Sequence, residues 1–228
     1  MENPLRLPPG ATEQDLRTAI VHAGRIAYDR GLITADDGNL SARLDRERIL
    51  LTPSGGCKGR LAPDGLLVLD LSGQVLSPGG GNARPSSETP MHLAAYRERP
   101  DVGAVIHAHP PYCIALTVAG IPLRADVLPE VLATLGAVPT SDFAMPASDE
   151  NADAIRELIQ EHDAILLRQH GALAVGADLE QALMRMERVE HAAMVIALAT
   201  LLGKVDVVPP EARDRLLAMY AASRARPG

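Results

Sequence analysis

Aromatic and lysine side chains are scarce in this sequence, and each scarcity excludes a class of function. Aromatic residues make up 2% of the 228 residues, so the bases of a nucleic acid would find few rings on which to stack. The net charge of −7 provides no positive field that would attract a nucleic acid or an anionic membrane surface. Only two lysines, Lys58 and Lys204, are available for Schiff-base chemistry. We therefore expect no nucleic-acid partner and no membrane partner.

Cysteines and long apolar runs are also few. Cys57 and Cys113 cannot form a disulfide framework, and a chain of 228 residues does not need one, which favours a reducing, cytoplasmic location. No stretch approaches the roughly 18 uninterrupted apolar residues that a membrane span requires, and the first residues lack a basic segment followed by an apolar one. We expect neither a transmembrane segment nor a signal peptide.

The pattern of apolar residues predicts a single α/β domain over residues 1–228, with a loose arm at 1–11 and a C-terminal helix and tail at 209–228. Apolar residues at helical spacing predict one helix that begins after Thr12 and a longer one that begins after Asp178. The β-branched segment 101–110 predicts a buried strand, and residues 163–176 predict a pair of strands. Between them we expect helices near 112–118 and 151–162, joined by a loop that contains several prolines.

Two histidines in the expected strand are the first indication of a metal site. His107 and His109 stand at positions i and i+2, so both imidazoles project from the same face and lie close enough to share one ion. The preceding VGAVI segment is typical of a buried strand, in which an unpaired imidazole would be costly. The alternative is a pair of polar strand-end residues that face solvent.

His170 and Glu88 complete a candidate ligand set. Each has an ordinary explanation when taken alone, because His170 can be a polar residue at a strand end and Glu88 can be a carboxylate favoured by a helix dipole. Together with His107 and His109 they match the nitrogen and oxygen ligands of a catalytic zinc ion, for which Mn²⁺ or Co²⁺ could substitute. His92, one helical turn after Glu88, competes as a ligand.

Three short segments have the composition of anion-binding turns. Two serines stand where a helix is expected to begin, and their hydroxyls and backbone N–H groups would lie at the positive end of its dipole. Two glycine-containing turns offer further N–H groups that could surround phosphate oxygens, although ordinary turn structure explains either one alone. In combination with the metal ligands they favour a phosphorylated small molecule as substrate. The candidate phosphate-binding residues are Gly38, Asn39, Ser54, Gly55, Ser86 and Ser87.

The sequence resembles the class II aldolase and adducin family over roughly residues 12–205. The resemblance is carried by five motifs in the family's order: GNLSARL (38–44), TPSG (52–55), SSE (86–88), MHLAAYRERPDVGAVIHAHPP (91–111) and LLRQHGALAVGADLEQAL (166–183). It implies a three-layer α/β/α fold with a mainly antiparallel central sheet, and a homotetramer with active sites at subunit interfaces. It also implies zinc held by His107, His109 and His170, with Glu88 as both metal ligand and proton-transferring base. Asn39, Ser54, Gly55, Ser86 and Ser87 match the family's phosphate-binding positions.

The activity implied by the resemblance is that of a zinc-dependent aldolase. It would cleave a ketose 1-phosphate, of the L-fuculose 1-phosphate or the 5-deoxy- or 5-methylthio-ribulose 1-phosphate type, to dihydroxyacetone phosphate and a short aldehyde. Zinc would replace a Schiff-base lysine, in keeping with the scarcity of lysine. A sugar-phosphate 4-epimerase, decarboxylase or dehydratase would use the same site. A non-catalytic, adducin-like assembly module is the alternative from another class, but such modules lose zinc ligands and this chain has all four.

The sequence departs from the family's fuculose phosphate aldolases in one respect. Those proteins place a tyrosine on the loop after the second strand histidine, contributed from the neighbouring subunit, and residues 121–130 contain none. An aldolase needs an acid that protonates the oxygen derived from the aldehyde. Asp126 and Tyr220 are the candidates for this acid, the latter reaching a site in an adjacent subunit.

Overall fold

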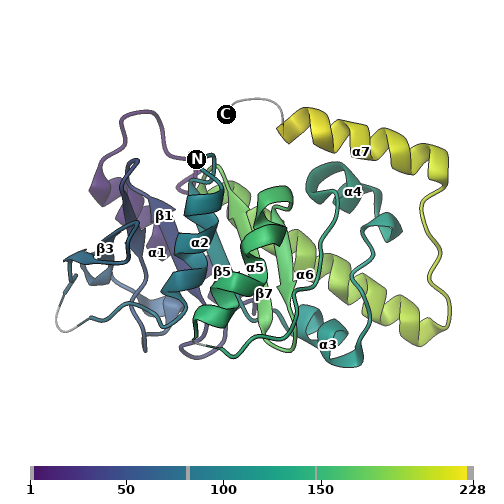
Figure 1. Ribbon diagram of the computed structural model, residues 1–228, viewed down its shortest axis with the longest axis horizontal. Helices are drawn as coiled ribbons and strands as arrows, with labels where there is room; N and C mark the ends of the chain where they lie inside the picture. Colours follow the sequence, from purple (N-terminus) through teal and green to yellow (C-terminus); the bar gives the residue numbers. More distant parts are fainter. Residues whose placement is uncertain (1–2, 81–82, 147, 225–228) are drawn as a thin grey trace.

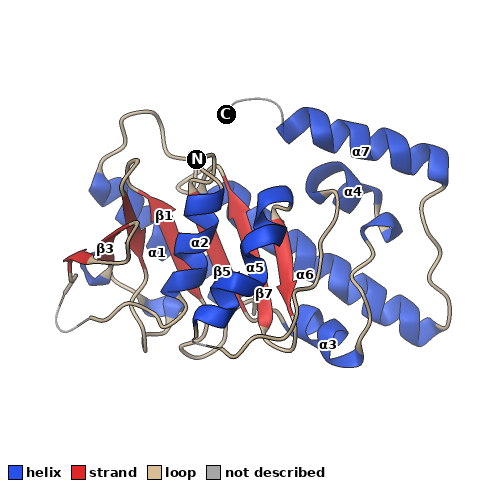
Figure 2. Ribbon diagram, in the orientation of Figure 1, coloured by secondary structure: helices blue, strands red, loops and turns tan. Residues whose placement is uncertain are grey.

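The fold is built around a seven-stranded sheet in the part of the chain that the computed structural model describes, which comprises residues 3–80, 83–146 and 148–224 (Figures 1 and 2). The strand order is β4-β3-β2-β1-β5-β7-β6, and every neighbouring pair is antiparallel. The strands are β1 (Asn39–Arg43), β2 (Arg48–Leu51), β3 (Leu67–Asp70), β4 (Val75–Ser77), β5 (Ala104–Ala108), β6 (Ala164–Leu167) and β7 (Gly171–Gly176). The expectation of a three-layer α/β/α fold with a mainly antiparallel sheet is confirmed.

Helices cover both faces of the sheet (Figure 1). One face packs against α2 and α5, and the opposite face packs against α1, α3, α4 and α6. The α-helices are α1 (Glu13–Asp29), α2 (Thr89–Glu98), α3 (Pro111–Ala119), α4 (Pro129–Leu135), α5 (Asp149–Glu161), α6 (Leu179–Leu202) and α7 (Pro210–Arg224). Short 3₁₀ turns occur at η1 (Lys58–Arg60), η2 (Pro63–Gly65) and η3 (Ala125–Val127). No helix within the described ranges is both long and apolar enough to traverse a membrane.

The strands alternate their side chains between the two helical layers, and this alternation places the histidines. In β5, Ala104 and Ile106 belong to the core under α1 and α6, whereas Val105 belongs to the core under α2 and α5. His107 follows Val105 by two residues and therefore lies on the α2 side of the sheet. The imidazole of His107 therefore faces the start of α2.

Helix ends follow the caps that the sequence predicts. Thr12 and Asp15 form a reciprocal capping box at the start of α1, and the Asp178 side chain accepts a hydrogen bond from the backbone N–H of Gln181 at the start of α6. Gly203 ends α6 in the left-handed conformation that glycine adopts without strain. These local signals fix where the two long helices begin and end.

Several expectations need correction. The arm over residues 1–11 is partly packed, because Leu5 is buried in the core; residues 1–2 lie outside the described part of the chain. The proline-containing loop includes the helix α4, which the sequence pattern did not reveal, and α7 continues to Arg224, with residues 225–228 of the expected tail not described. The strand pair turns at residues 168–170, so Gly171 begins β7 and does not form the turn.

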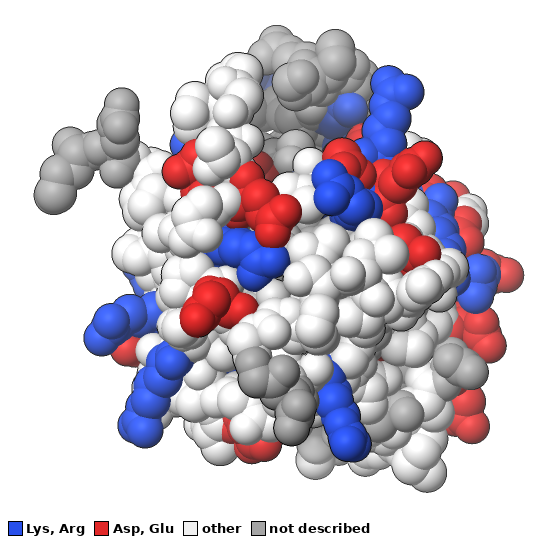
Figure 3. All heavy atoms as spheres, turned by 90° about the vertical axis from the view of Figure 1, so that its left-hand side faces the viewer, with Lys and Arg blue, Asp and Glu red and all other residues white. Residues whose placement is uncertain are grey.

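The charged side chains of the described residues are mixed in sign on the face that Figure 3 shows.

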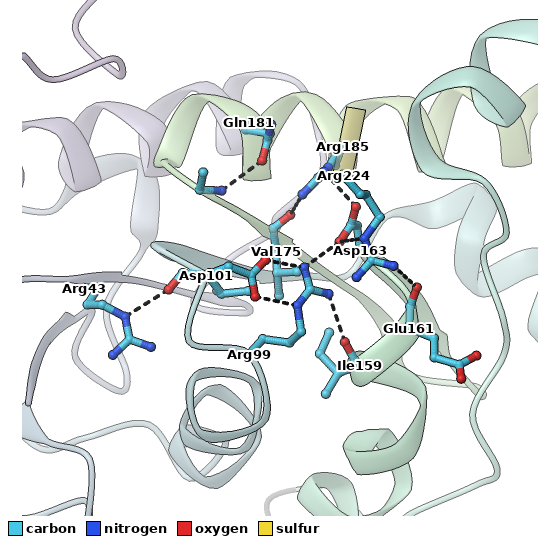
Figure 4. Close-up of polar contacts among 12 residues, drawn as sticks. Arg43, Arg99, Asp101, Ile159, Glu161, Asp163, Val175, Gln181, Arg185 and Arg224 are labelled. Carbon is cyan, nitrogen blue, oxygen red and sulfur yellow. Dashed lines mark hydrogen bonds and ion pairs between the residues drawn. The ribbon is translucent and has the colours of Figure 1, made fainter. Parts of the chain in front are cut away.

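The carboxylate of Asp163 is buried, with its side chain 1% exposed, and it is surrounded by cationic partners (Figure 4). It pairs with Arg185 at 2.7 Å and Arg99 at 3.1 Å, and it accepts a hydrogen bond from Tyr220 of α7 at 3.1 Å. Burial, and then the charge of Asp163, raise the pKa of Tyr220 to about 12. This cluster attaches α7 to the end of the sheet.

We expect Asp163→Asn to destabilise the protein by about 3–5 kcal/mol, because the guanidinium group of Arg185 would lose its counter-charge and that of Arg99 would keep only Asp101. Urea unfolding measures this loss. The control is Asp206→Asn, since Asp206 pairs with Lys204 where both side chains are 79% exposed, and the unfolding midpoint should hardly change. Equal midpoints for the two variants would contradict a stabilising role for the buried cluster.

Candidate metal centre

Adjacent strands bring the candidate ligands together from distant parts of the sequence. Asn39 of β1 stands directly opposite His107 of β5, and β7 lies on the other side of β5. His109 follows the end of β5 by one residue, and His170 is the last residue of the turn before β7, so neither lies within a strand as the sequence pattern predicted. Glu88 immediately precedes α2, at its N-cap position, without capping the helix through its side chain.

Three imidazoles and one carboxylate converge at this point. The Nε2 atom of His107 lies 3.0 Å from Nε2 of His109 and 3.2 Å from Oε2 of Glu88. The other carboxylate oxygen of Glu88 lies 3.0 Å from Nε2 of His170. One ligand atom from each of the four residues falls within 4.8 Å of the others, and the centroids of the three rings are 4.8–4.9 Å apart.

The short separations are near those of a four-coordinate metal ion. Ligand bonds of about 2.0–2.2 Å place the ligand atoms of a tetrahedral site about 3.3–3.6 Å apart, compared with 3.0–3.2 Å for the three short contacts here and up to 4.8 Å across the whole set. Nδ1 of His107 donates a hydrogen bond to the carbonyl of Ala172, at 3.0 Å, which leaves the lone pair of Nε2 directed at the cluster. Nδ1 of His109 lies 3.6 Å from Asp37. The donor set suits Zn²⁺, and also Mn²⁺ or Co²⁺.

The carboxylate of Glu88 also suits metal binding. Burial opposes its ionisation, but the neighbouring side chains of His107, His170 and Asn39 outweigh burial and hold the pKa of Glu88 well below its ordinary value. Burial, followed by the neighbouring His107 and His170, lowers the pKa of His109 to about 4. The carboxylate is therefore ionised and the His109 imidazole is neutral at pH 7, as ligands must be.

His92, the competing ligand, makes other contacts. It is fully buried, and its Nε2 donates to the side-chain oxygen of Asn39 at 2.5 Å while its Nδ1 accepts from the hydroxyl of Ser41 at 2.6 Å. The Asn39 amide nitrogen then donates to Glu88 at 2.8 Å. Burial above all lowers the pKa of His92 to about 3, so it is neutral. His92 thus orients Asn39, which in turn holds the carboxylate of Glu88.

Backbone geometry explains two of the glycines at the site. Gly38 has a φ of +68°, and a Cβ there would lie 2.8 Å from the carbonyl oxygen of His107. A Cβ on Gly171 would lie 2.3 Å from the carbonyl oxygen of Ala108, so only glycine lets β7 approach β5 this closely. Gln169, with a φ of +56°, is held by a hydrogen bond from its N–H to the hydroxyl of Thr117. This strained turn fixes the position of the adjacent His170.

A pocket of about 280 Å³ opens beside the cluster. The loop of residues 52–55 pairs with the segment before α2. The N–H of Ser54 donates a hydrogen bond to the carbonyl of Arg84, and Pro53 and Pro85 form an isolated antiparallel β-bridge. Ser86 accepts a hydrogen bond from Asn39 at 3.1 Å, and both serines precede α2, at the helix start where the sequence pattern places them. The pocket is lined by Asp36, Asp37, Gly38, Asn39, Ser54, Gly55, Lys58, Ser86, Ser87, Glu88, His109, Pro146 and His170. All six candidate phosphate-binding residues are among them.

The two candidates for the acid lie elsewhere in the chain. Tyr220 is bound to Asp163, whose carbonyl pairs with the N–H of Val175 at the far end of β7. Val175 is five residues from His170, or about 17 Å along an extended strand. Asp126 is paired with Arg124 at 2.9 Å in η3. Neither residue lines the pocket of its own chain, so a role for either one would require a neighbouring copy.

Sequence reasoning did not identify the supporting residues. Ser41 and Tyr96 lie inside two of the family motifs but were given no supporting role, and Thr117 and Asp37 lie outside the motifs. Only the strand register and the helix packing bring these four residues to the site. Lys58 was considered only as a Schiff-base candidate, whereas the structure places it at the pocket.

A family model, curated relatives and solved structures that resemble this chain agree with one another. The family model described as "Class II Aldolase and Adducin N-terminal domain" matches residues 18–197. A 3-oxo-tetronate 4-phosphate decarboxylase of Pectobacterium atrosepticum is 32% identical over 82% of this chain and 85% of its own length. A methylthioribulose-1-phosphate dehydratase of Pseudomonas syringae is 36% identical over 78% of this chain and 92% of its own. A solved structure of L-fuculose 1-phosphate aldolase has a TM-score of 0.83 at 27% identity, covering 96% of this chain and all of the other.

We expect the purified protein to bind about one divalent ion per chain and His107→Ala to lose it, because a four-ligand site would lose its most buried nitrogen. Metal content after dialysis, measured by mass spectrometry, tests this. His92→Asn should keep its metal, since His92 contacts Asn39 and Ser41. Full occupancy in His107→Ala, or metal loss in His92→Asn with the fold intact, would contradict the ligand assignment.

Proposed function

This chain belongs to the class II aldolase and adducin family, and we propose that it is a metal-dependent aldolase acting on a ketose 1-phosphate. Its substrate would be of the L-fuculose 1-phosphate or 5-deoxy- or 5-methylthio-ribulose 1-phosphate type, and its products would be dihydroxyacetone phosphate and a short aldehyde. One observation supports this above all. The carboxylate of Glu88 borders both the histidine cluster and the pocket lined by Ser54, Ser86 and Ser87.

The pocket would hold the substrate by its phosphate. Hydroxyls of Ser54, Ser86 and Ser87 offer neutral donors for the ester oxygens. Asn39 already joins Ser86 to Glu88, so a phosphate bound here places the neighbouring carbons of the substrate close to that carboxylate. A divalent ion held by His107, His109 and His170, when bound, would stabilise the negative charge that develops on the substrate's carbonyl and hydroxyl oxygens.

Glu88 would transfer the proton at carbon. In the direction of condensation its carboxylate removes one C–H proton from the hydroxymethyl carbon of dihydroxyacetone phosphate, and that electron pair then forms the new bond to the aldehyde carbon. The aldehyde oxygen becomes a hydroxyl by taking a proton from an acid. In cleavage the proton leaves that hydroxyl, the carbon–carbon bond breaks, and Glu88 returns a proton to carbon. In the homotetramer that we propose, Tyr220 or Asp126 of another copy would be that acid.

Decarboxylation is the second candidate, and the placement of Tyr220 and Asp126 favours it. When a 3-oxo acid phosphate loses CO₂, the electrons of the broken bond pass to the carbonyl side to give an enediolate, and Glu88 then delivers to the carbon a proton that it takes up from solvent. No alcohol proton has to be removed, so the reaction needs no residue beyond those at the pocket of one chain. The decarboxylase relative described above is consistent with this reaction.

Proton exchange isolates the step that we assign to Glu88. We expect the metal-loaded protein to exchange one hydroxymethyl proton of dihydroxyacetone phosphate with D₂O, and Glu88→Gln to exchange it at least about 100-fold more slowly. Proton NMR measures the exchange without any aldehyde. Asp36→Asn, which neutralises another carboxylate of the pocket, should keep most of the rate. Exchange by Glu88→Gln at the original rate would eliminate Glu88 as the base.

The products distinguish the reactions. We expect dihydroxyacetone phosphate and an aldehyde from one of the ketose 1-phosphates named above, abolished by a chelator and restored by Zn²⁺. The protein should be assayed in parallel with a 3-oxo-tetronate 4-phosphate, 5-methylthioribulose 1-phosphate and L-ribulose 5-phosphate. Release of CO₂, loss of water or inversion at C4 would reassign it as a decarboxylase, dehydratase or epimerase. No turnover of any of these substrates, with metal bound, would favour a non-catalytic module.

A further inference from the structure

Lys58 is a buried cation that the proposed reaction does not use. It is 2% exposed, yet it lines the pocket beside the metal cluster. Among the described residues that line this pocket it is the only lysine or arginine. The other charged side chains there are the carboxylates of Asp36, Asp37 and Glu88, together with the titratable rings of His109 and His170.

Close packing of η1 against α1 fixes the position of Lys58. A Cβ on Gly24 would lie 2.7 Å from the carbonyl oxygen of Lys58, so the helix can approach this turn only because residue 24 is glycine. One residue later, a Cβ on Gly59 would lie 2.6 Å from the ring of Tyr28. The backbone of Lys58 is therefore held between the helix and the pocket, and its side chain has one direction in which to extend.

The ammonium group has more donors than the protein satisfies. Its Nζ donates to the backbone carbonyl of Asp36 at 2.5 Å, the one hydrogen bond recorded for it among the described residues. An ammonium carries three donors, and a buried charge is costly unless it is paired and hydrogen-bonded. Burial accordingly lowers the pKa of Lys58, while the nearby carboxylates of Asp36 and Asp37 act in the opposite direction. The remaining donors call for an anionic acceptor inside the pocket.

The charge balance of the pocket indicates the same kind of acceptor. Ser54, Ser86, Ser87 and Asn39 are neutral, so they can bind phosphate oxygens but cannot offset the charge of a phosphate monoester, about −2 at pH 7. Three carboxylates in the same pocket would repel such a group. A cation in the pocket, in addition to any metal held by the histidines, would offset this repulsion, and Lys58 is the lysine or arginine that lines the described part of the pocket.

We propose that Lys58 is a substrate-binding residue that forms an ion pair with the phosphate of the substrate while keeping its hydrogen bond to Asp36. The inference rests on the proposed function in so far as the substrate is a phosphate ester. It gives the pocket a preference for phosphorylated over unphosphorylated hydroxyketones. Lys58 does not act as a Schiff-base amine in this proposal, because proton transfer at carbon is assigned to Glu88.

The test compares binding of two probes that differ only in the phosphate. Calorimetry with the metal-loaded protein should give a dissociation constant for dihydroxyacetone phosphate that rises about 10- to 100-fold in Lys58→Met. Binding of dihydroxyacetone should stay the same. Lys204→Met is the matched control, since Lys204 is the other lysine of the chain and is 79% exposed, and it should bind both probes as the unaltered protein does. Lys58→Arg should recover part of the affinity for the phosphorylated probe.

Three results would overturn the inference. Unchanged affinity for dihydroxyacetone phosphate in Lys58→Met is the first. The second is an equal loss for both probes, which would mean that Lys58 only supports the loop at Asp36. The third is inactivation of the unaltered protein by borohydride in the presence of dihydroxyacetone phosphate, with the label on Lys58, which would make it a Schiff-base residue. Lys58→Gln replaces Lys58→Met in the comparison if the latter binds no metal or melts early.

The outcomes separate this inference from the proposed function. If Lys58→Met loses affinity for dihydroxyacetone phosphate but the unaltered protein turns over none of the candidate substrates, the aldolase proposal fails and the role of Lys58 stands. If the unaltered protein is an active aldolase and Lys58→Met binds dihydroxyacetone phosphate normally, only the role of Lys58 fails.

Discussion

One buried carboxylate organises this site. Glu88 lies within 3.2 Å of His107 and 3.0 Å of His170, and it receives a hydrogen bond from Asn39. Burial alone would favour its neutral form, so the ionised form persists only because donors surround it. Three imidazoles packed around a single anion also bring the Nε2 atoms of His107, His109 and His170 toward one point. A divalent cation would use the nitrogen lone pairs and the negative charge at once, which is why the arrangement is chemically sensible as a metal centre and costly as mere packing.

The hydrogen bonds behind Glu88 form a chain. In this chain the donor or acceptor role of each group fixes the role of the next group. The Asn39 amide donates to Glu88, so its oxygen must accept from Nε2 of His92. Nδ1 of His92 is then an acceptor for the hydroxyl of Ser41, whose oxygen lies 2.9 Å from the hydroxyl of Tyr96. All four supporting side chains are buried. A network that is fully satisfied in one direction fixes the Asn39 amide, and hence the carboxylate, more firmly than a single contact could.

What the sequence predicts well is local, and what it predicts poorly depends on strand pairing. The capping pairs Thr12–Asp15 and Asp178–Gln181 involve residues three positions apart, so helix ends could be read from the sequence. The convergence of His107 and His109 follows from their spacing, but their meeting with His170 and Glu88 depends on β5 lying beside β7 and on α2 crossing the same face. Residue spacing contains no such information, and the family resemblance supplied it. The roles of Ser41 and Tyr96 behind His92 were missed because a serine and a tyrosine inside apolar segments look like packing residues.

One half of the site, which comprises the candidate metal and phosphate groups, is built by this chain alone, and the other half is not. This difference accounts for the range of reactions that the site could support. The candidate metal ligands, Glu88 and the candidate phosphate pocket are contributed by elements that the sheet and the packing of η1 position. In the proposed reactions these groups would act on the part of a substrate that an aldolase, a decarboxylase and a dehydratase would share, the phosphorylated hydroxyketone. The groups that would act on the other product do not include Tyr220 or Asp126 of the same chain. Selection among the proposed reactions would therefore depend on groups outside the shared half, and a change in those groups could alter the reaction without disturbing the charge compensation around Glu88.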